Sequence, residues 1–160
     1  DAVLLTELAQ VVLEGVKKRD NRLLKKLYEL NDNCFPRADE VRSRLMETLD
    51  FIKVDLNEVL ASNSIKPYML YSLFSAIYYN KYGIPGLDSS IVGGAQPISS
   101  FCINPQAASQ RVLELIGSID GAHPSGSELA EFKSASLSTT NVKSRLSRLK
   151  IMIKAIQGIS

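Results

Sequence analysis

The chain contains 160 residues, of which 45% are apolar and 22% are charged, and its formal net charge at pH 7 is +2. These values are typical of a globular protein with a packed core, and they exclude the disordered and fibrous classes. The apolar run at residues 67–80 is too short to span a bilayer, so we expect no membrane partner and a cytoplasmic protein.

Seven segments of the chain carry the apolar spacing or the capping residues of helices, and none alternates in the way a strand requires. We therefore expect an all-α fold in which residues 1–160 form a single helical domain. Because the sequence begins at Asp1 rather than at methionine, we also expect a fragment of a longer protein. The expected helices cover residues 2–17, 20–30, 38–60, 67–82, 105–118, 125–132 and 140–156.

Several helix starts are marked by side chains that accept hydrogen bonds from free backbone N–H groups. Asp1 is placed to cap the first helix, and Asn104 precedes the proline that starts the fifth. Three other helices each have two candidate caps. These are Asp20 or Asn21, Ser125 or Ser127, and Thr139 or Thr140.

The helix at 67–82 is apolar around almost its whole circumference, with charges only at Lys66 and Lys81. Such a helix is usually central, so we expect about seven helices packed around it. Its five tyrosines are more typical of a core than of a surface that stacks bases. The following residues, 83–104, contain four glycines and two prolines among apolar anchors, and they predict a long ordered loop.

No arrangement of side chains in the sequence is typical of an active site or a metal site. His123 is the only histidine, and it lies in a predicted turn without a nucleophile motif. Cys34 and Cys102 have neither CxxC spacing nor a histidine nearby, so we expect two reduced thiols and no zinc. We therefore expect no enzymatic activity, no cofactor and no metal in this chain.

The strongest functional signal is the last predicted helix, because residues 136–156 contain five cations and no acid. Val142, Leu146, Leu149, Ile153 and Ile156 form an apolar stripe that we expect to face a core. The other faces favour a phosphate backbone, since cations and a helix start both attract anions. A solvated basic face without a ligand is an equally good interpretation. The residues expected at a nucleic-acid interface are Thr140, Asn141, Lys143, Arg145, Arg148, Lys150 and Lys154.

A second basic patch lies at the junction of the first two predicted helices. If the fold brings the two patches together, they form one surface for an anionic partner. Nothing in either patch favours a particular base sequence, so we expect any DNA binding to be non-specific. The second patch consists of Lys17, Lys18, Arg19, Arg22, Lys25 and Lys26.

Four stretches carry a resemblance to a known family, and together they cover most of the chain. They are LAQVVLEGVKKRDNRLLKKLYELND, RLMETLDFI, KPYMLYSLFSAIYYNKYGIP and ELAEFKSASLSTTNVKSRLSRLKIMI. In their order they are similar to the helical C-terminal part of the ParB-like domain of GmrSD-type restriction endonucleases and related bacterial anti-phage proteins. The residues that match the closing pattern of this family are Thr139, Thr140, Asn141, Arg145 and Arg148.

The resemblance implies a place in a bacterial restriction system. In that family, nucleotide-dependent nuclease chemistry is associated with a DGQR motif in an N-terminal ParB-like domain, sometimes joined to an HNH nuclease. Neither motif occurs here, so the resemblance implies the helical accessory portion of a defence protein, with the ParB-like domain as a partner.

Two functions are therefore expected as alternatives. The first is a non-catalytic module that helps to engage DNA, whose affinity is lost when Lys143, Arg145 and Arg148 are replaced together by glutamate. The second is a protein-interaction or oligomerisation domain whose basic C-terminal helix docks on an acidic partner.

Overall fold

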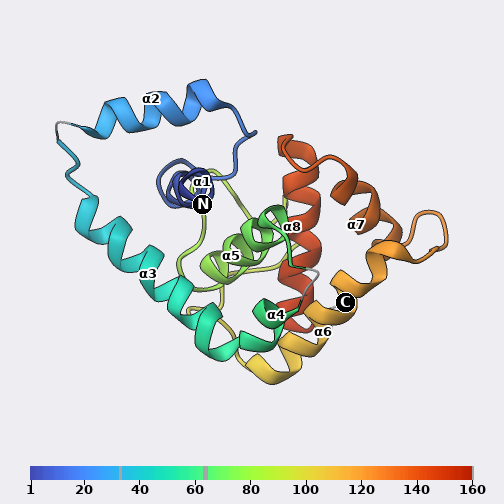
Figure 1. The fold of residues 1–160 in the computed structure, drawn as a ribbon. Coiled ribbons are helices and arrows are strands. Elements are labelled where there is room, and N and C mark those ends of the chain that lie inside the picture. Colours follow the sequence, from blue (N-terminus) through green and yellow to red (C-terminus); the bar gives the residue numbers. More distant parts are fainter. Residues whose placement is uncertain (33, 63–64, 160) are drawn as a thin grey trace.

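The computed structural model of the chain describes residues 1–32, 34–62 and 65–159, and these form α-helices joined by turns and loops (Figure 1). Within these ranges the only extended pairing is an isolated bridge between Ile84 and Leu87. The all-α class predicted from the sequence is confirmed. The elements are α1 (Ala2–Glu14), α2 (Asn21–Asp32), α3 (Ala38–Asp55), α4 (Asn57–Ala61), α5 (Pro67–Tyr82), α6 (Pro105–Gly117), the 3₁₀ helix η1 (Ser118–Asp120), α7 (Glu128–Leu137) and α8 (Val142–Gln157).

Helix starts follow the capping residues of the sequence. The side chain of Asp1 accepts a hydrogen bond from the N–H of Val3 at 2.9 Å, and that of Asn104 accepts one from the N–H of Ala107 at 3.1 Å. At α7 the cap is Ser127, and Ser125 lies outside the helix. The predicted helix ends agree less well with the structure, since α7 continues to Leu137, beyond the expected end at residue 132.

The predicted helix over residues 38–60 is in fact two helices. Leu56 lies between α3 and α4 with φ −117° and ψ 30°, outside helical geometry, and its side chain is fully buried. The chain changes direction here, so that α4 turns away from the axis of α3 (Figure 1). The apolar spacing is continuous through this break, which is why periodicity predicted one helix.

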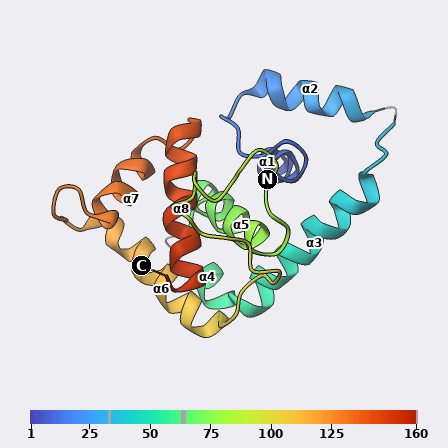
Figure 2. The ribbon, with the colours of Figure 1, turned by 180° about the vertical axis from the view of Figure 1, so that it is seen from behind.

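The core is built around α5, as predicted, but α8 shares the central position. Every residue from 71 to 80 in α5 is buried. α8 packs against α5, α6 and α7, and it stands beside α5 in both views (Figures 1 and 2). No helix in the described part of the chain is long and apolar enough to cross a bilayer. The buried apolar residues of α8 are Leu149, Ile151, Met152, Ile153 and Ile156.

The loop over residues 83–104 is ordered and follows the surface of α5 and α8 (Figure 2). Asn80 holds it twice, because its carbonyl accepts the N–H of Ile98 at 2.7 Å and its side chain donates to the carbonyl of Phe101 at 3.1 Å. The hydroxyl of Tyr79 donates to the carbonyl of Ala95 at 2.6 Å. The loop is therefore part of the packed structure, as expected.

Candidate nucleic-acid interface

The N-terminus of α8 is capped by Asn141, and not by Thr139 or Thr140 as expected. The side-chain oxygen of Asn141 accepts a hydrogen bond from the N–H of Ser144 at 2.8 Å. The two threonines precede the helix. The carbonyl of Thr139 accepts a hydrogen bond from Arg148, and that of Thr140 accepts one from the N–H of Arg19. Thr140 and Asn141 are exposed, so the start of α8 is open to an anion.

The five cations of α8 divide into two groups. Arg145 and Arg148 are 4% and 0% exposed, whereas Lys143 is exposed and Lys150 and Lys154 are partly exposed. The two arginines therefore lie in the interior and are not available to a ligand in this conformation. The apolar stripe also differs from the expected one at its start, because Val142 is 41% exposed.

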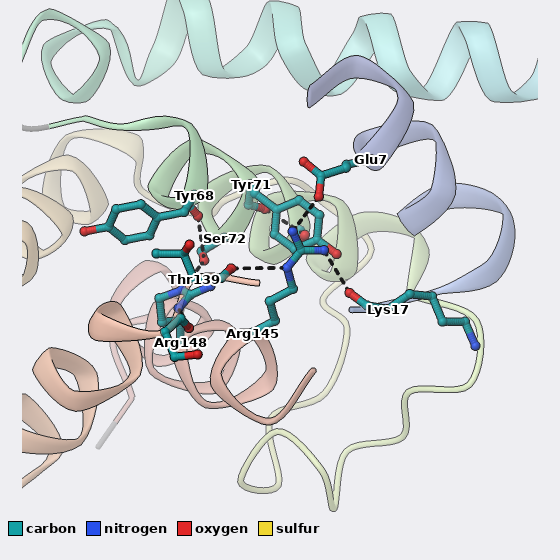
Figure 3. A network of polar contacts seen from close by, with 10 residues as sticks. Glu7, Lys17, Tyr68, Tyr71, Ser72, Thr139, Arg145 and Arg148 are labelled. Carbon is teal, nitrogen blue, oxygen red and sulfur yellow. Dashed lines mark hydrogen bonds and ion pairs between the residues drawn. The ribbon is translucent and has the colours of Figure 1, made fainter. Parts of the chain in front are cut away.

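Arg145 joins the first and last helices of the structure (Figure 3). Its Nη2 donates to Oε1 of Glu7 at 2.5 Å, and its Nη1 donates to the carbonyl of Lys17 at 2.8 Å. Its guanidinium lies over the ring of Tyr71, at 4.1 Å from the centroid. A buried carboxylate, a carbonyl and an aromatic face thus compensate the charge of Arg145.

Arg148 binds the C-terminal end of α7 and the turn that follows (Figure 3). Its guanidinium donates to the carbonyl of Ala135, to that of Ser138 at 3.1 Å and to that of Thr139 at 2.9 Å. The carbonyl of Ala135 is one of those that the end of a helix leaves without a partner, and a cation there also opposes the negative end of the helix dipole. Burial lowers the pKa of Arg148 to about 10, so its side chain keeps its charge at neutral pH.

The two C-terminal lysines of α8 pair with acids on α7. Lys150 is 2.9 Å from Glu131, and Lys154 is 3.2 Å from Glu128. A hydrogen bond from the hydroxyl of Ser147, together with Lys150, lowers the pKa of Glu131. This part of α8 carries balanced charge and is a poor candidate for a phosphate contact.

The second basic patch lies directly beside the start of α8. The N–H of Arg19 donates to the carbonyl of Thr140 at 2.8 Å, and the carbonyl of Lys17 accepts from Arg145 at 2.8 Å. The fold therefore brings the two patches together, although they are more than 100 positions apart. We call their shared exposed cations the joined basic surface, which consists of Lys17, Lys18, Arg19, Arg22 and Lys143.

Acidic groups neutralise the joined basic surface only in part. Asp20 lies 3.6 Å from Lys18 and 3.9 Å from Arg22. A hydrogen bond from the backbone N–H of Arg22 is the main cause that lowers the pKa of Asp20. Lys25 and Lys26 lie further along α2 and are exposed, and Lys25 is 3.7 Å from Glu29. Exposed ammonium and guanidinium groups of this kind bind phosphate without defining a base sequence.

Other sequence candidates are placed in the core or in turns. Tyr71, Tyr78 and Tyr79 are 3%, 1% and 1% exposed, which confirms for these three the prediction that the tyrosines of α5 fill the core, whereas Tyr68 and Tyr82 are only partly buried. His123 contacts the carbonyl of Ser118 at 2.6 Å within its turn. Among the described residues, no group of three or more His, Cys, Asp or Glu side chains is placed to hold a metal ion.

Comparisons with known proteins give no further assignment. No family model, no curated protein and no solved structure matches this chain.

Proposed function

We propose that this chain is a non-catalytic helical module that binds the phosphate backbone of DNA in the cytoplasm through the joined basic surface. The observation that carries the proposal is the hydrogen bond from the N–H of Arg19 to the carbonyl of Thr140, because it brings the backbone of the basic segment 17–22 to the start of α8, where Lys143 is exposed. Neutralised phosphates release condensed counterions, so such binding depends steeply on salt and weakly on base sequence.

The interface proposed from the structure is narrower than the one expected from the sequence. Arg145 and Arg148 support the fold, and replacing them would test folding rather than binding. Lys150 and Lys154 are paired with α7. The contacts with DNA are therefore assigned to the joined basic surface, with Thr140 and Asn141 at the helix start.

The test compares two variants that change charge equally. One carries Arg19→Gln and Lys143→Gln in the joined basic surface, and the other carries Arg42→Gln and Lys53→Gln at exposed positions of α3. Fluorescence anisotropy with two duplexes of unrelated sequence, at several salt concentrations, gives the affinity and its salt slope. We expect the first variant to flatten the slope by about 0.9 for each phosphate that it no longer neutralises, and the second to leave the slope unchanged. Equal effects of the two variants would contradict the proposed surface.

We further propose that the module belongs to a restriction-type defence protein, beside an N-terminal ParB-like domain. This part rests on the sequence resemblance alone. Sequencing the native gene upstream of Asp1 tests it, because the absence of a DGQR-type motif in the encoded protein would contradict it.

A protein-interaction function is the second candidate, and the surface between α1 and α2 favours it. Leu5 and Tyr28 are 48% and 68% exposed. They line a hollow of about 390 Å³, whose other lining residues are mostly apolar but include Asp32. Exposed apolar surface of this kind is typical of a docking site. Self-association that does not change with salt, measured by sedimentation, would favour this candidate over DNA binding.

A further inference from the structure

A cavity of about 500 Å³ lies on a different part of the molecule, between α3, the C-terminal half of α5 and the loop over residues 83–97. This volume is within the range of small-molecule sites, which extends from about 300 to about 1,000 Å³. Its polar lining includes Arg37, Arg44, Tyr78, Asp88 and Gln96. None of these residues belongs to the joined basic surface, so the cavity is a separate candidate site.

Two arginines give one side of the cavity an excess of positive charge. Nε of Arg37 lies 3.1 Å from Glu40, and Nη2 of Arg44 lies 3.0 Å from the same carboxylate. Two guanidinium groups therefore share one negative charge. Each guanidinium has five N–H donors, so several of them remain for a carboxylate or phosphate group in the cavity.

Tyr78 adds a buried donor beside these arginines. The tyrosine is 1% exposed, and its hydroxyl oxygen accepts a long hydrogen bond of 3.5 Å from Nη1 of Arg44. The hydroxyls of Tyr79 and Tyr82 differ, because they donate to Ala95 at 2.6 Å and to Glu47 at 2.7 Å. Within the described residues, the hydroxyl proton of Tyr78 has no acceptor. Tyr78 lines the cavity, so an anionic oxygen bound there would give this proton an acceptor.

The other walls of the cavity favour a partly apolar body. They include Val12, Ile84 and Leu87. Asp88 adds a carboxylate that accepts a hydrogen bond from the N–H of Ser90 at 2.8 Å, and its charge opposes a ligand that is anionic throughout. A ligand with one anionic group and a hydrogen-bond donor elsewhere can pair the anionic group with the arginines and the donor with Asp88.

We propose that this cavity binds a small organic anion whose carboxylate or phosphate group is held by Arg37, Arg44 and the hydroxyl of Tyr78. The body of the ligand lies against the apolar walls, and its hydrogen-bond donors face Asp88 and Gln96. The shared chemistry is the anionic group on a partly apolar body, and phosphate and carboxylate ligands are separated by the choice of probe.

The test is a titration of the ¹⁵N-labelled protein, followed by amide chemical shifts. The probes are adenosine monophosphate, 4-aminobenzoate, and adenosine as the matched compound without an anion. We expect saturable shifts in residues 78–97 with at least one of the two anions, and none with adenosine. Absence of saturable shifts with both anions at millimolar concentration would overturn the proposal.

Matched variants separate this site from the surface proposed for DNA. We expect Arg44→Gln to weaken anion binding at least tenfold and Tyr78→Phe to weaken it about fivefold. Arg42→Gln is the control, since it removes the same charge from the exposed side of α3. The variant with Arg19→Gln and Lys143→Gln should bind the anion with unchanged affinity. If that variant loses anion binding while Arg44→Gln and Tyr78→Phe keep it, the cavity is not the site.

Discussion

Arg145 and Glu7 are 138 positions apart in the sequence, and their side chains form a buried ion pair at 2.5 Å. The arginine side chain is 4% exposed and the glutamate side chain is 6% exposed. The pair joins α8 to α1 across one edge of α5, where the guanidinium also covers the ring of Tyr71. The helix that looked from the sequence like a binding surface is thus a structural element that holds the two ends of the fold together.

Replacement of Glu7 by glutamine should destabilise the protein strongly. The change leaves the charge of Arg145 in the interior without its carboxylate, and breaking a buried pair in this way typically costs about 3–5 kcal/mol. Urea unfolding measures the loss. Glu14→Gln, in the same helix but exposed, is the control and should cost less than about 1 kcal/mol. Equal stability of the two variants would show that the pair contributes nothing.

Replacement of Arg148 by methionine should destabilise the protein by about 3 kcal/mol, because carbonyl groups at the end of α7 lose their buried donors. Methionine retains much of the apolar stem, so the loss reports mainly on the guanidinium. Lys150→Met is the comparison in the same helix, since it breaks a partly exposed pair with Glu131 that contributes at most about 1 kcal/mol. Urea unfolding of both variants checks the difference, and similar losses would contradict the assignment.

Tyr71 should contribute a loss of stability at high pH. Burial raises the pKa of this tyrosine from 10.0 to about 12, against an opposing effect of Arg145. As the pH rises above 10, the unfolded chain loses this proton first, so the folded state is progressively disfavoured until about pH 12. The contribution of one such group is about 3 kcal/mol. Urea unfolding at a series of pH values measures it. The decline in unfolding free energy with rising pH should be smaller in Tyr71→Phe than in the unsubstituted protein. It should be unchanged in Tyr28→Phe, where the ring is 68% exposed.

Gly15 should not tolerate a side chain. It has φ +97°, and a Cβ atom there would lie 2.3 Å from the carbonyl oxygen of Pro85. Gly94 is the matched position, since it has φ +86° and a Cβ atom there would meet nothing within 4 Å. Both Gly→Ala changes carry a conformational cost of about 1–2 kcal/mol, and the steric conflict at Gly15 should add at least about 1 kcal/mol. Thermal unfolding of the two variants gives the comparison, and equal melting temperatures would contradict it.

Local rules predicted much of the fold. The apolar circumference of α5 and the proline at its start predicted both its boundaries and its central position. The caps Asp1, Asn104 and Ser127 lie at the starts where local chemistry placed them. The division of α3 from α4 was not predictable in this way, because Leu56 continues the apolar spacing while its backbone leaves the helix.

The candidate site was predicted less well, although a signal was present. At about 100° per residue, Lys143, Lys150 and Lys154 share one side of α8, whereas Arg145 and Arg148 lie on the opposite side with Met152. The net charge of the helix does not contain that division. The proximity of the two basic patches, and the cavity beside Arg44 and Tyr78, depend on long-range packing that no local pattern contains.

The pairing of α1 with α8 has a consequence for biosynthesis. The buried pair cannot form while only the N-terminal part of the chain has been translated, because Glu7 is synthesised long before Arg145. Until α8 leaves the ribosome, α1 and α5 expose polar and apolar groups that belong to a shared core. Contacts between such distant residues slow folding and leave nascent chains open to aggregation. Release of the last helix is therefore the event that allows the native fold to close.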